Sequence, residues 1–410
     1  MSDSVDIAVI GSGASGLAAA ITAARAGARV LLLDERPAPG GTGGFSGLTT
    51  LCGLYDDAGN FLNDGFAREF AGALSSAAPL KMGKVWVLPY RPEKFCALAA
   101  ELIAATPNLE VRWNTSLSEL NGVMNGKDFQ WPQDGRASLS PARRAEIQDD
   151  ASMPENASPR RAEDSDALPV VGGRIITINS RPVGAVVDCS GFAVVARALN
   201  LPCLETDATT QAPAVVFALH NVTRDLSSLA AVAQVLLPLA RAGLPPVSLQ
   251  PNLEPNSVTV KLAGRPEQAG SVIEFLRHNV EGFEECVTPV TEFTLAHRAG
   301  RMIPGHYTLT GDDVLAARKF PDAVARCAWP IEQWNTDGVV RCRYLPPGAC
   351  YEIPARALRS AAVANLFMAG KTLSADADAI ASARVMGCGL ATGAAAGQLA
   401  VASLESARTR

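Results

Sequence analysis

The spacing of apolar residues predicts a strand, a helix and a second strand at the start of the chain. Residues 6–10 (DIAVI) form a short apolar run, as in a strand buried inside a parallel sheet. A helical pattern follows residue 16 and ends near Gly27, because glycine readily adopts the positive φ found at helix C-termini. Residues 29–33 form another apolar run. Together these segments predict a βαβ unit.

The same patterning predicts further strands and helices along the chain. Strands are expected where short apolar runs lie between turn residues, and helices where apolar residues recur every three or four positions. The expected strands are residues 84–88, 109–114, 174–178, 184–188, 214–219, 258–262, 291–295 and 365–370. The expected helices begin at Pro92 or span 227–241, 268–280 and 384–397, and the glycine-rich residues 43–56 are expected to form a loop.

The turn of the first βαβ unit carries a GxGxxG motif, which predicts a dinucleotide-binding site. Gly11 permits the tight turn, Gly13 lets the backbone approach a pyrophosphate, and Gly16 lets helix and strand pack closely. Asp34 ends the second strand, 18 residues after the last glycine, where a carboxylate binds a ribose hydroxyl and disfavours a 2′-phosphate. The motif therefore predicts FAD or NAD, bound by Gly11, Ser12, Gly13, Ala14, Ser15, Gly16 and Asp34.

The residues after Asp34 favour FAD. They read ERPAPGGT, and a double-glycine loop with a hydroxyl offers backbone donors near a second phosphate or a ribityl chain. This segment resembles the extended FAD fingerprint of flavoproteins with two dinucleotide-binding domains. The predicted contacts are Glu35, Arg36, Gly41 and Thr42.

A small-residue helix near the C-terminus is expected to return to the same cofactor. Gly393 and Gly397 permit close backbone approach, and the N–H groups at 387–389 form a helix start. The partial positive charge of such a start suits the N1/C2 carbonyl edge of a flavin.

The chain resembles the FAD-dependent oxidoreductases of the glutathione-reductase-like Rossmann type. The matching segments are residues 9–42, 186–191, 300–315, 329–334, 351–358 and 365–400. The resemblance implies that Leu117 borders the adenine and that residues 189–191 lie beside the adenosine. The further FAD contacts expected on this basis are Leu117, Cys189, Ser190, Gly191, Gly370, Lys371, Asp376, Arg384, Val385, Met386 and Gly387.

The expected fold class is α/β, with a Rossmann-like FAD/NAD(P)-binding domain built on a parallel sheet and an inserted α+β substrate or cap domain. The FAD domain is expected to be discontinuous, formed by residues 1–125, 168–200 and 350–410. Residues 201–349 are expected to form the cap, as the resemblance implies. Residues 126–167, rich in Pro, Ser, Arg, Asp and Glu and without apolar periodicity, predict a flexible insertion.

Composition narrows the function classes. The net charge is −5, so the chain lacks the excess of cations that nucleic-acid binding requires. No apolar run reaches the roughly 18 residues of a membrane span, and the N-terminus lacks the basic region of a signal peptide. The nine cysteines include no CxxC pair, which argues against structural zinc and disulfides. We therefore expect a cytoplasmic protein with reduced thiols and no metal.

Five residues are candidates for chemistry. Cys52 lies in the glycine-rich segment, where its thiol faces the flavin or is simply a small buried group. His297, Arg298 and His306 lie in HRAGRMIPGH (297–306), which could bind an anionic substrate and supply a base. Alternatively, its arginines form structural ion pairs with Asp312, Asp313 or Glu332. Glu332 lies between two tryptophans, in a pocket lining or in a packing contact. Arg384 is expected near the flavin, supporting its reduced form or binding a carboxylate.

Three functions are compatible with this pattern. The first is an FAD-dependent dehydrogenase or oxidase that moves a hydride from a small organic substrate to flavin N5. The second is a desaturase or isomerase of an apolar substrate, which an apolar cap lining would favour. The third is a flavin-binding electron-transfer or scaffold subunit working with a partner protein. No second GxGxxG follows residue 200, so a separate nicotinamide domain is not expected.

Overall fold

The computed structural model describes residues 4–117, 120–124, 127–130, 173–206, 211–290, 293, 295–335 and 340–408. Of the insertion predicted at 126–167, only β8 (Lys127–Gln130) lies within the described residues.

A parallel sheet organises the N-terminal, middle and C-terminal segments into one domain. Its strands, in spatial order, are β6 (Leu109–Arg112), β2 (Val30–Leu33), β1 (Val5–Ile10), β10 (Arg181–Asp188) and β21 (Leu366–Met368). Each neighbouring pair is parallel. All four residues of β2 are buried, as expected for a strand covered on both faces. The prediction of an α/β, Rossmann-like fold is confirmed.

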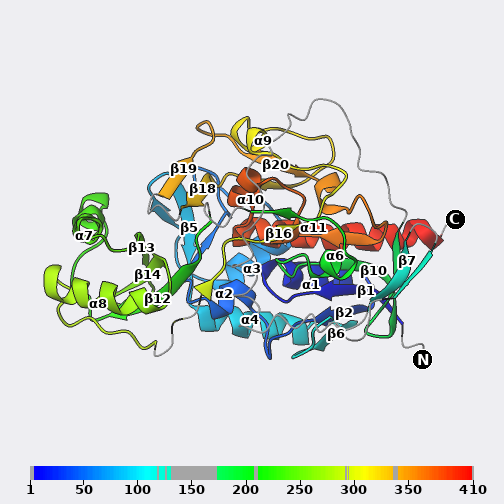
Figure 1. Ribbon diagram of the computed structural model, residues 1–410, viewed down its shortest axis with the longest axis horizontal. Coiled ribbons are helices and arrows are strands. Elements are labelled where there is room, and N and C mark those ends of the chain that lie inside the picture. Colours follow the sequence, from blue (N-terminus) through cyan, green and yellow to red (C-terminus); the bar gives the residue numbers. More distant parts are fainter. Residues whose placement is uncertain are drawn as a thin grey trace.

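Two helices from opposite ends of the chain pack closely on this sheet. Figure 1 shows α11 (Met386–Arg408, red) running beside α1 (Ala14–Arg25, blue). A Cβ at Gly393 would lie 2.1 Å from the carbonyl oxygen of Ser15, and one at Gly397 would lie 2.5 Å from that of Ala19. The helix backbones therefore touch at two glycines, and this confirms the close approach predicted from the sequence.

Helix α11 is also long and apolar enough to cross a membrane, by length and composition alone. However, 61% of its apolar window is buried inside the protein, and buried core helices meet the same criterion. The absence of a membrane span stays a prediction.

A second sheet lies apart from the first, and we call this sheet with its two covering helices the cap. Its strands β13 (Val247–Pro251), β14 (Ser257–Ala263), β12 (Ala214–His220) and β15 (Leu295–Ala296) follow one another in this spatial order and pair antiparallel. Only residues 293 and 295 of the strand predicted at 291–295 are described. Figure 1 shows the sheet at the left, between the cap helices and the rest of the molecule.

Two helices, α7 (Leu229–Arg241) and α8 (Glu267–Asn279), cover the outer face of this sheet. Val258, Val260 and Leu262 of β14 pack into a common core with residues of both helices. Because successive side chains of a strand point to opposite faces, the residues between them face the FAD-side domain. This alternation sets the position of the polar residues described below.

The first sheet continues beyond β10 through β9 (Arg174–Ile178), β7 (Leu120–Met124) and β8, which pair antiparallel. The remaining elements lie outside the two sheets. They are α2 (Gly41–Phe45), β3 (Thr50–Cys52), α3 (Phe66–Leu74), β4 (Leu80–Met82), β5 (Val85–Pro89), α4 (Pro92–Ala104), α6 (Val194–Ala198), β11 (Leu204–Glu205), β16 (Arg301–Met302), α9 (Gly311–Leu315), β17 (Ala323–Cys327), β18 (Ile331–Trp334), β19 (Val340–Arg343), β20 (Tyr351–Pro354), η1 (Ala355–Leu358), η2 (Gly370–Thr372) and α10 (Ala377–Ala383).

The prediction of a loop over residues 43–56 is wrong in part. Gly41 starts the short helix α2, and Thr50–Cys52 forms β3, which pairs antiparallel with β5. The prediction missed both elements because the high glycine content of this segment is typical of a loop. Gly40 and Gly41 have φ of +139° and +50°, so they supply a left-handed turn ahead of α2 rather than a long irregular loop.

Candidate active site

The glycine-rich turn before α1 is closed by contacts that only glycine allows. Gly11 has φ +95°, and a Cβ there would lie 2.9 Å from the carbonyl oxygen of Cys189. A Cβ at Gly16 would lie 1.7 Å from the carbonyl oxygen of Gly11. By contrast, the nearest atom to a Cβ at Gly13 is 3.9 Å away. The turn is therefore tightly packed at Gly11 and Gly16 and open at Gly13.

Gly13 is the N-cap of α1 and offers no side-chain hydrogen bond to the first turn. The N–H groups of Ala14, Ser15 and Gly16 are thus the uncapped donors of a helix start, with the partial positive charge of the helix dipole. Gly41 lies directly against this turn, since a Cβ there would be 2.7 Å from Cα of Gly13. This cradle of glycines and free donors fits a diphosphate.

Asp34 is fixed at the end of β2, beside the turn. Its Oδ2 accepts hydrogen bonds of 2.6 Å from both the backbone N and the Oγ of Ser12, and its Oδ1 accepts one from the N of Arg36. The carbonyl oxygen of Asp34 accepts from Thr115 N, two residues before the buried Leu117. Oδ1 of Asp34 therefore has a lone pair left for a ribose hydroxyl.

The predicted contacts from the middle and end of the chain meet the turn from its other side. Ser190 donates to Asp188 at the end of β10, and Gly191 lies against Lys371, whose Cε would be 2.7 Å from a Cβ at Gly191. A Cβ at Gly370 would lie 2.2 Å from Oγ of Ser15. Two distant segments, residues 188–191 and 370–371, therefore meet at the start of α1.

The loop residues Glu35 and Thr42 are less enclosed. Glu35 is half-buried, and Thr42 is exposed in α2, where its carbonyl oxygen accepts from Ser46. Arg36 places its guanidinium 5.4 Å from the ring centroid of Phe45. These three residues border the cradle.

This cradle agrees with a comparison against protein families. The chain matches the family described as FAD dependent oxidoreductase over residues 6–131 and 239–410. It belongs to that family. FAD is therefore its cofactor, and the donors at the start of α1, Asp34 and the Gly40–Gly41 turn are the residues that fit its diphosphate and ribose.

Curated relatives match this flavoprotein over short segments. The alpha chain of sarcosine oxidase from Corynebacterium sp. (strain U-96) is 65% identical over 37 residues, 9% of this chain and 4% of the relative. Its counterpart from Rhizobium meliloti (strain 1021), also an alpha chain of sarcosine oxidase, has the same identity over the same length and coverage. The matches thus span less than a tenth of these relatives' length.

Solved structures with low sequence identity match nearly the whole chain. A geranylgeranyl bacteriochlorophyll reductase-like protein of Thermoplasma acidophilum has a TM-score of 0.44 and 12% identity, covering 98% of this chain and 79% of its own. The p-nitrophenol 4-monooxygenase PnpA of Pseudomonas putida DLL-E4 has a TM-score of 0.41 and 11% identity, covering 99% and 82%.

A cluster of polar side chains lies between the cap and the FAD domain; we call it the charged cluster. Its members are Cys52 on β3, Lys261 on β14, Arg298, Glu332 on β18 and Arg384 just before α11. Their charges act on one another, so the pKa of each member is shifted in part by other members of the cluster. The sequence predicted four of the five as functional candidates, and the fold brings those four together.

The fifth member, Lys261, was missed by the sequence analysis. Val260 and Leu262 face the cap helices, so Thr259 and Lys261 face the opposite side of β14. Thr49, next to β3, donates a 2.8 Å hydrogen bond to Oγ1 of Thr259, which joins this face to the FAD domain. A lone lysine in an otherwise apolar strand (VTVKLA) was the available signal.

Glu332 is held at the centre of the charged cluster. The indole Nε1 of Trp334 donates to its Oε1 at 2.9 Å, and that of Trp329 donates to its Oε2 at 3.2 Å. Arg384 Nη2 lies 3.9 Å from Oε2 and donates to the Glu332 carbonyl oxygen at 3.3 Å. Burial opposes ionisation of Glu332, but Arg384, Lys261 and the Trp334 hydrogen bond outweigh it, so its pKa is lowered.

Arg298 stacks on the same tryptophan and is only 9% exposed. Its Cζ lies 4.2 Å from the Trp334 ring centroid, and its Nη1 donates to the carbonyl oxygen of Ala212 at 2.7 Å. Burial and the nearby Arg384 lower the pKa of Arg298 to about 9, which leaves it charged at neutral pH. Among the described residues, its Nη2 and the Nε of Arg384 are buried without a hydrogen-bond partner.

Burial shifts the two remaining groups toward their neutral forms. It raises the pKa of Cys52 to about 11, so the thiol stays protonated at neutral pH. It also lowers the pKa of Lys261, and the positive charges of Arg298 and Arg384 lower it further. Lys261 therefore gives up its proton more readily than an exposed lysine does.

Three predicted residues lie outside the charged cluster. The ring of His297 packs against Phe192, and its carbonyl oxygen accepts from Nζ of Lys371. His306 is exposed. The carboxylate of Asp376 accepts from the backbone N of Ala379 and of Gly311, so it caps α10. His297 and His306 are therefore close to Arg298 in the sequence, but their side chains do not join it in the charged cluster.

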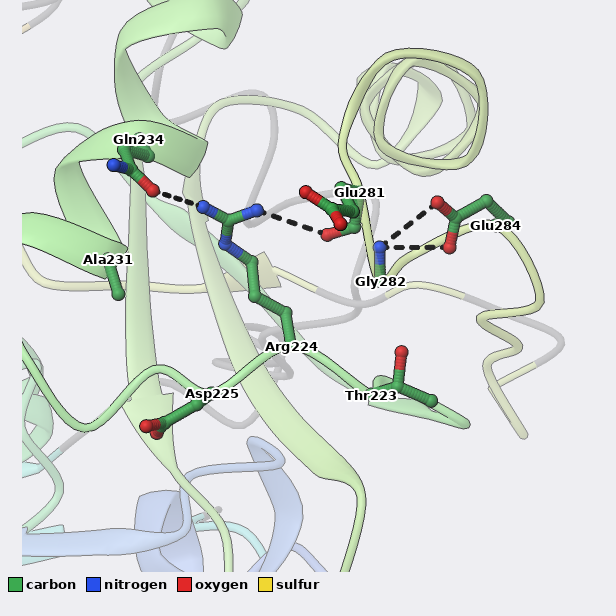
Figure 2. A pocket seen from close by; sticks show the side chains of 8 residues that line it. All are labelled: Thr223, Arg224, Asp225, Ala231, Gln234, Glu281, Gly282 and Glu284. Atoms are coloured by element: carbon green, nitrogen blue, oxygen red, sulfur yellow. Dashed lines mark hydrogen bonds between the residues drawn. The ribbon is translucent and has the colours of Figure 1, made fainter.

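The structure also has a hollow of about 490 Å³ in the outer part of the cap, shown in Figure 2. Arg224 lies across it and donates to Oε1 of Gln234 and to the carbonyl oxygen of Glu281. No member of the charged cluster lines it. Among the described residues, no group of three His, Cys, Asp or Glu could hold a metal ion.

Proposed function

We propose that this FAD oxidoreductase is a dehydrogenase or oxidase that removes a hydride from a small alcohol or amine. The observation that supports it most is the charged cluster, which combines a readily deprotonated lysine with fixed charges at the junction of cap and FAD domain. FAD, when bound, accepts two electrons together with a hydrogen from the substrate carbon. The protein must then orient the substrate and take up one proton.

Lys261 is the proton acceptor in this proposal. As the substrate C–H bond donates its hydride, the neighbouring O–H or N–H bond releases a proton and a C=O or C=N bond forms. The neutral amine of Lys261 takes that proton and becomes an ammonium, which Glu332 can stabilise. The alternation of β14 and the lowered pKa of Lys261 support this role.

The contact between the start of α11 and the residue after Cys52 supports a flavin ring beside the charged cluster. A Cβ at Gly387 would lie 2.5 Å from the backbone of Gly53, so the first turn of α11 touches the residue after Cys52. Val385 and Met386, which precede it, connect Arg384 to this turn. These residues suit the ring system of FAD, as the family resemblance implies.

The inner face of the cap is polar, and this favours oxidation of an alcohol or amine over desaturation or isomerisation of an apolar substrate. Besides Lys261, it includes Thr259 and Gln250, whose Oε1 accepts from Oγ1 of Thr50. An apolar substrate would leave Nη2 of Arg298 and Nε of Arg384 without polar partners, which is costly in a buried site. The desaturase or isomerase alternative is thus less well supported.

Anaerobic mixing of the FAD-loaded protein with a panel of small alcohols and amines tests the proposal. We expect at least one panel member to bleach the visible flavin absorption, and readmitted air then distinguishes an oxidase from a dehydrogenase by its reoxidation rate. Both curated relatives are named as parts of an oxidase, so this second step is informative. If nothing in the panel bleaches the flavin but an isolated partner protein does, the electron-transfer role replaces this proposal.

Substitution of Cys52 by alanine is expected to lower kcat by less than tenfold. The thiol is protonated at neutral pH because burial raises its pKa to about 11, so it is a poor nucleophile and a poor base. Steady-state kinetics with a substrate found in the panel measure the effect. A loss of a hundredfold or more with normal FAD content would instead restore Cys52 as a catalytic residue.

A further inference from the structure

Two guanidinium groups in the charged cluster have a buried N–H without a partner. These are Nη2 of Arg298 and Nε of Arg384, and neither has an acceptor among the described residues. A buried donor on a charged group is unfavourable unless something accepts its hydrogen bond. Both atoms therefore indicate that an acceptor is missing from the protein itself.

The charges point to an anion as that acceptor. With Lys261 neutral, as the proposed function requires, the cluster contains the guanidinium groups of Arg298 and Arg384 and the carboxylate of Glu332. Among the described residues, Glu332 is the carboxylate whose charge acts on each arginine. One positive charge is left over. A group with a single negative charge would balance it, whereas a phosphate dianion would leave the site negative.

The fixed positions of both arginines suit recognition of a planar anion. Arg298 is held by its stack on Trp334 and its bond to Ala212, and Arg384 by its bond to the carbonyl oxygen of Glu332. A guanidinium fixed in this way loses little freedom on binding, and its planar N–H groups match the two oxygens of a carboxylate.

Resting on the proposed function, we infer that the substrate is a monocarboxylate, whose carboxylate is bound by Arg298 and Arg384 at the charged cluster. Its oxidisable carbon then faces the start of α11, and its O–H or N–H faces Lys261. Glu332 positions Arg384 and does not contact the carboxylate.

Binding of unreactive carboxylates to the FAD-loaded protein tests this inference without turnover. The probes are acetate, propionate and benzoate, each paired with its uncharged amide, and methyl phosphate as a dianion. Binding is read from perturbation of the flavin absorption and from the shift in Tm. We expect saturable binding of at least one carboxylate, at least tenfold tighter than that of its amide and of methyl phosphate.

Substitution of either arginine should weaken that binding selectively. Arg298→Gln and Arg384→Gln are expected to raise the Kd of the carboxylate at least tenfold and to leave the weak amide binding unchanged, and Arg298→Lys should recover part of the loss. The matched control is Arg301→Gln, since Arg301 lies three residues on and pairs with Glu205 at 2.8 Å. It removes the same charge and should leave the Kd unchanged.

The two proposals fail in different ways. If no carboxylate binds, if an amide binds as tightly as its carboxylate, or if Arg298→Gln and Arg301→Gln behave alike, the inference is overturned even when an alcohol or amine bleaches the flavin. If carboxylates bind as expected but no oxidisable carboxylate bleaches it, the anion site stands and the proposed function fails.

Discussion

The Gly13→Glu variant is expected to fold and to be colourless. Gly13 has φ −68° and ψ −176°, a conformation open to any residue, and a Cβ there meets no atom closer than 3.9 Å. The apoprotein should therefore keep its stability. The added carboxylate, however, lies at the start of α1, where the N–H donors and helix dipole suit a diphosphate, and two like charges cannot share that position.

The expected loss in FAD affinity is at least about a hundredfold, or about 2.8 kcal/mol. It can be measured by titrating apoprotein with FAD and following its fluorescence. Gly72→Glu is the matched control, because Gly72 is exposed in α3 and a Cβ there meets nothing within 4 Å. Normal yellow protein from Gly13→Glu would contradict the placement of the diphosphate at α1.

Gly16→Ala separates packing from cofactor binding. A methyl group there would lie 1.7 Å from the carbonyl oxygen of Gly11, so the turn itself must shift. We expect this variant to unfold at a lower temperature even without FAD, in contrast to Gly13→Glu. Circular dichroism melting curves of both apoproteins distinguish the two effects.

The sequence was most informative where structure depends on neighbouring residues. The βαβ unit, its glycines and Asp34 act within a few dozen residues, and the fold displays a local steric reason for Gly11 and Gly16 of the motif. The close packing of the C-terminal helix was also predictable, because Gly393 and Gly397 leave one face of this helix without side chains. These predictions needed no knowledge of how the cap docks.

Residues whose role depends on docking of the cap could not be found in this way. Lys261 is separated from Cys52 by about two hundred positions, and hydrogen bonds between distant segments, Thr49 to Thr259 and Thr50 to Gln250, bring them close. In 297–306, residues that are close in sequence lie apart in the fold. There the extended β16 and the contact of the chain with Arg359 lead His306 away to the surface while Arg298 turns toward Trp334.

Asp376, predicted as a cofactor contact, has a structural role that its position also predicts. An aspartate directly before a helix is a common N-cap, and this one accepts a 2.7 Å hydrogen bond from the N of Ala379. A second acceptor role toward Gly311 N joins α10 to α9. Its contact with the cofactor stays a prediction.

Lys261→Met is expected to lower kcat by about a hundredfold to ten-thousandfold, the usual contribution of a general base. Methionine is unbranched and fills much of the same space, so the cap sheet should pack as before. FAD content and the binding of unreactive carboxylates should change little, since Arg298 and Arg384 remain. A variant that loses FAD or carboxylate binding along with its rate would assign Lys261 a structural role instead.

The pH dependence provides the decisive comparison. Because the base is the neutral amine, kcat of the native enzyme should rise as pH increases through the lowered pKa of Lys261. The stability of the folded protein should also increase with pH. Folded Lys261 binds its proton more weakly than the unfolded chain does, so the free energy of unfolding increases with pH from that lowered pKa up to 10.5. Lys261→Met should lose both the rising limb of kcat and this increase in stability, and chemical denaturation at several pH values measures the second. If both persist in the variant, another group is the base and the charged cluster serves only to bind the substrate.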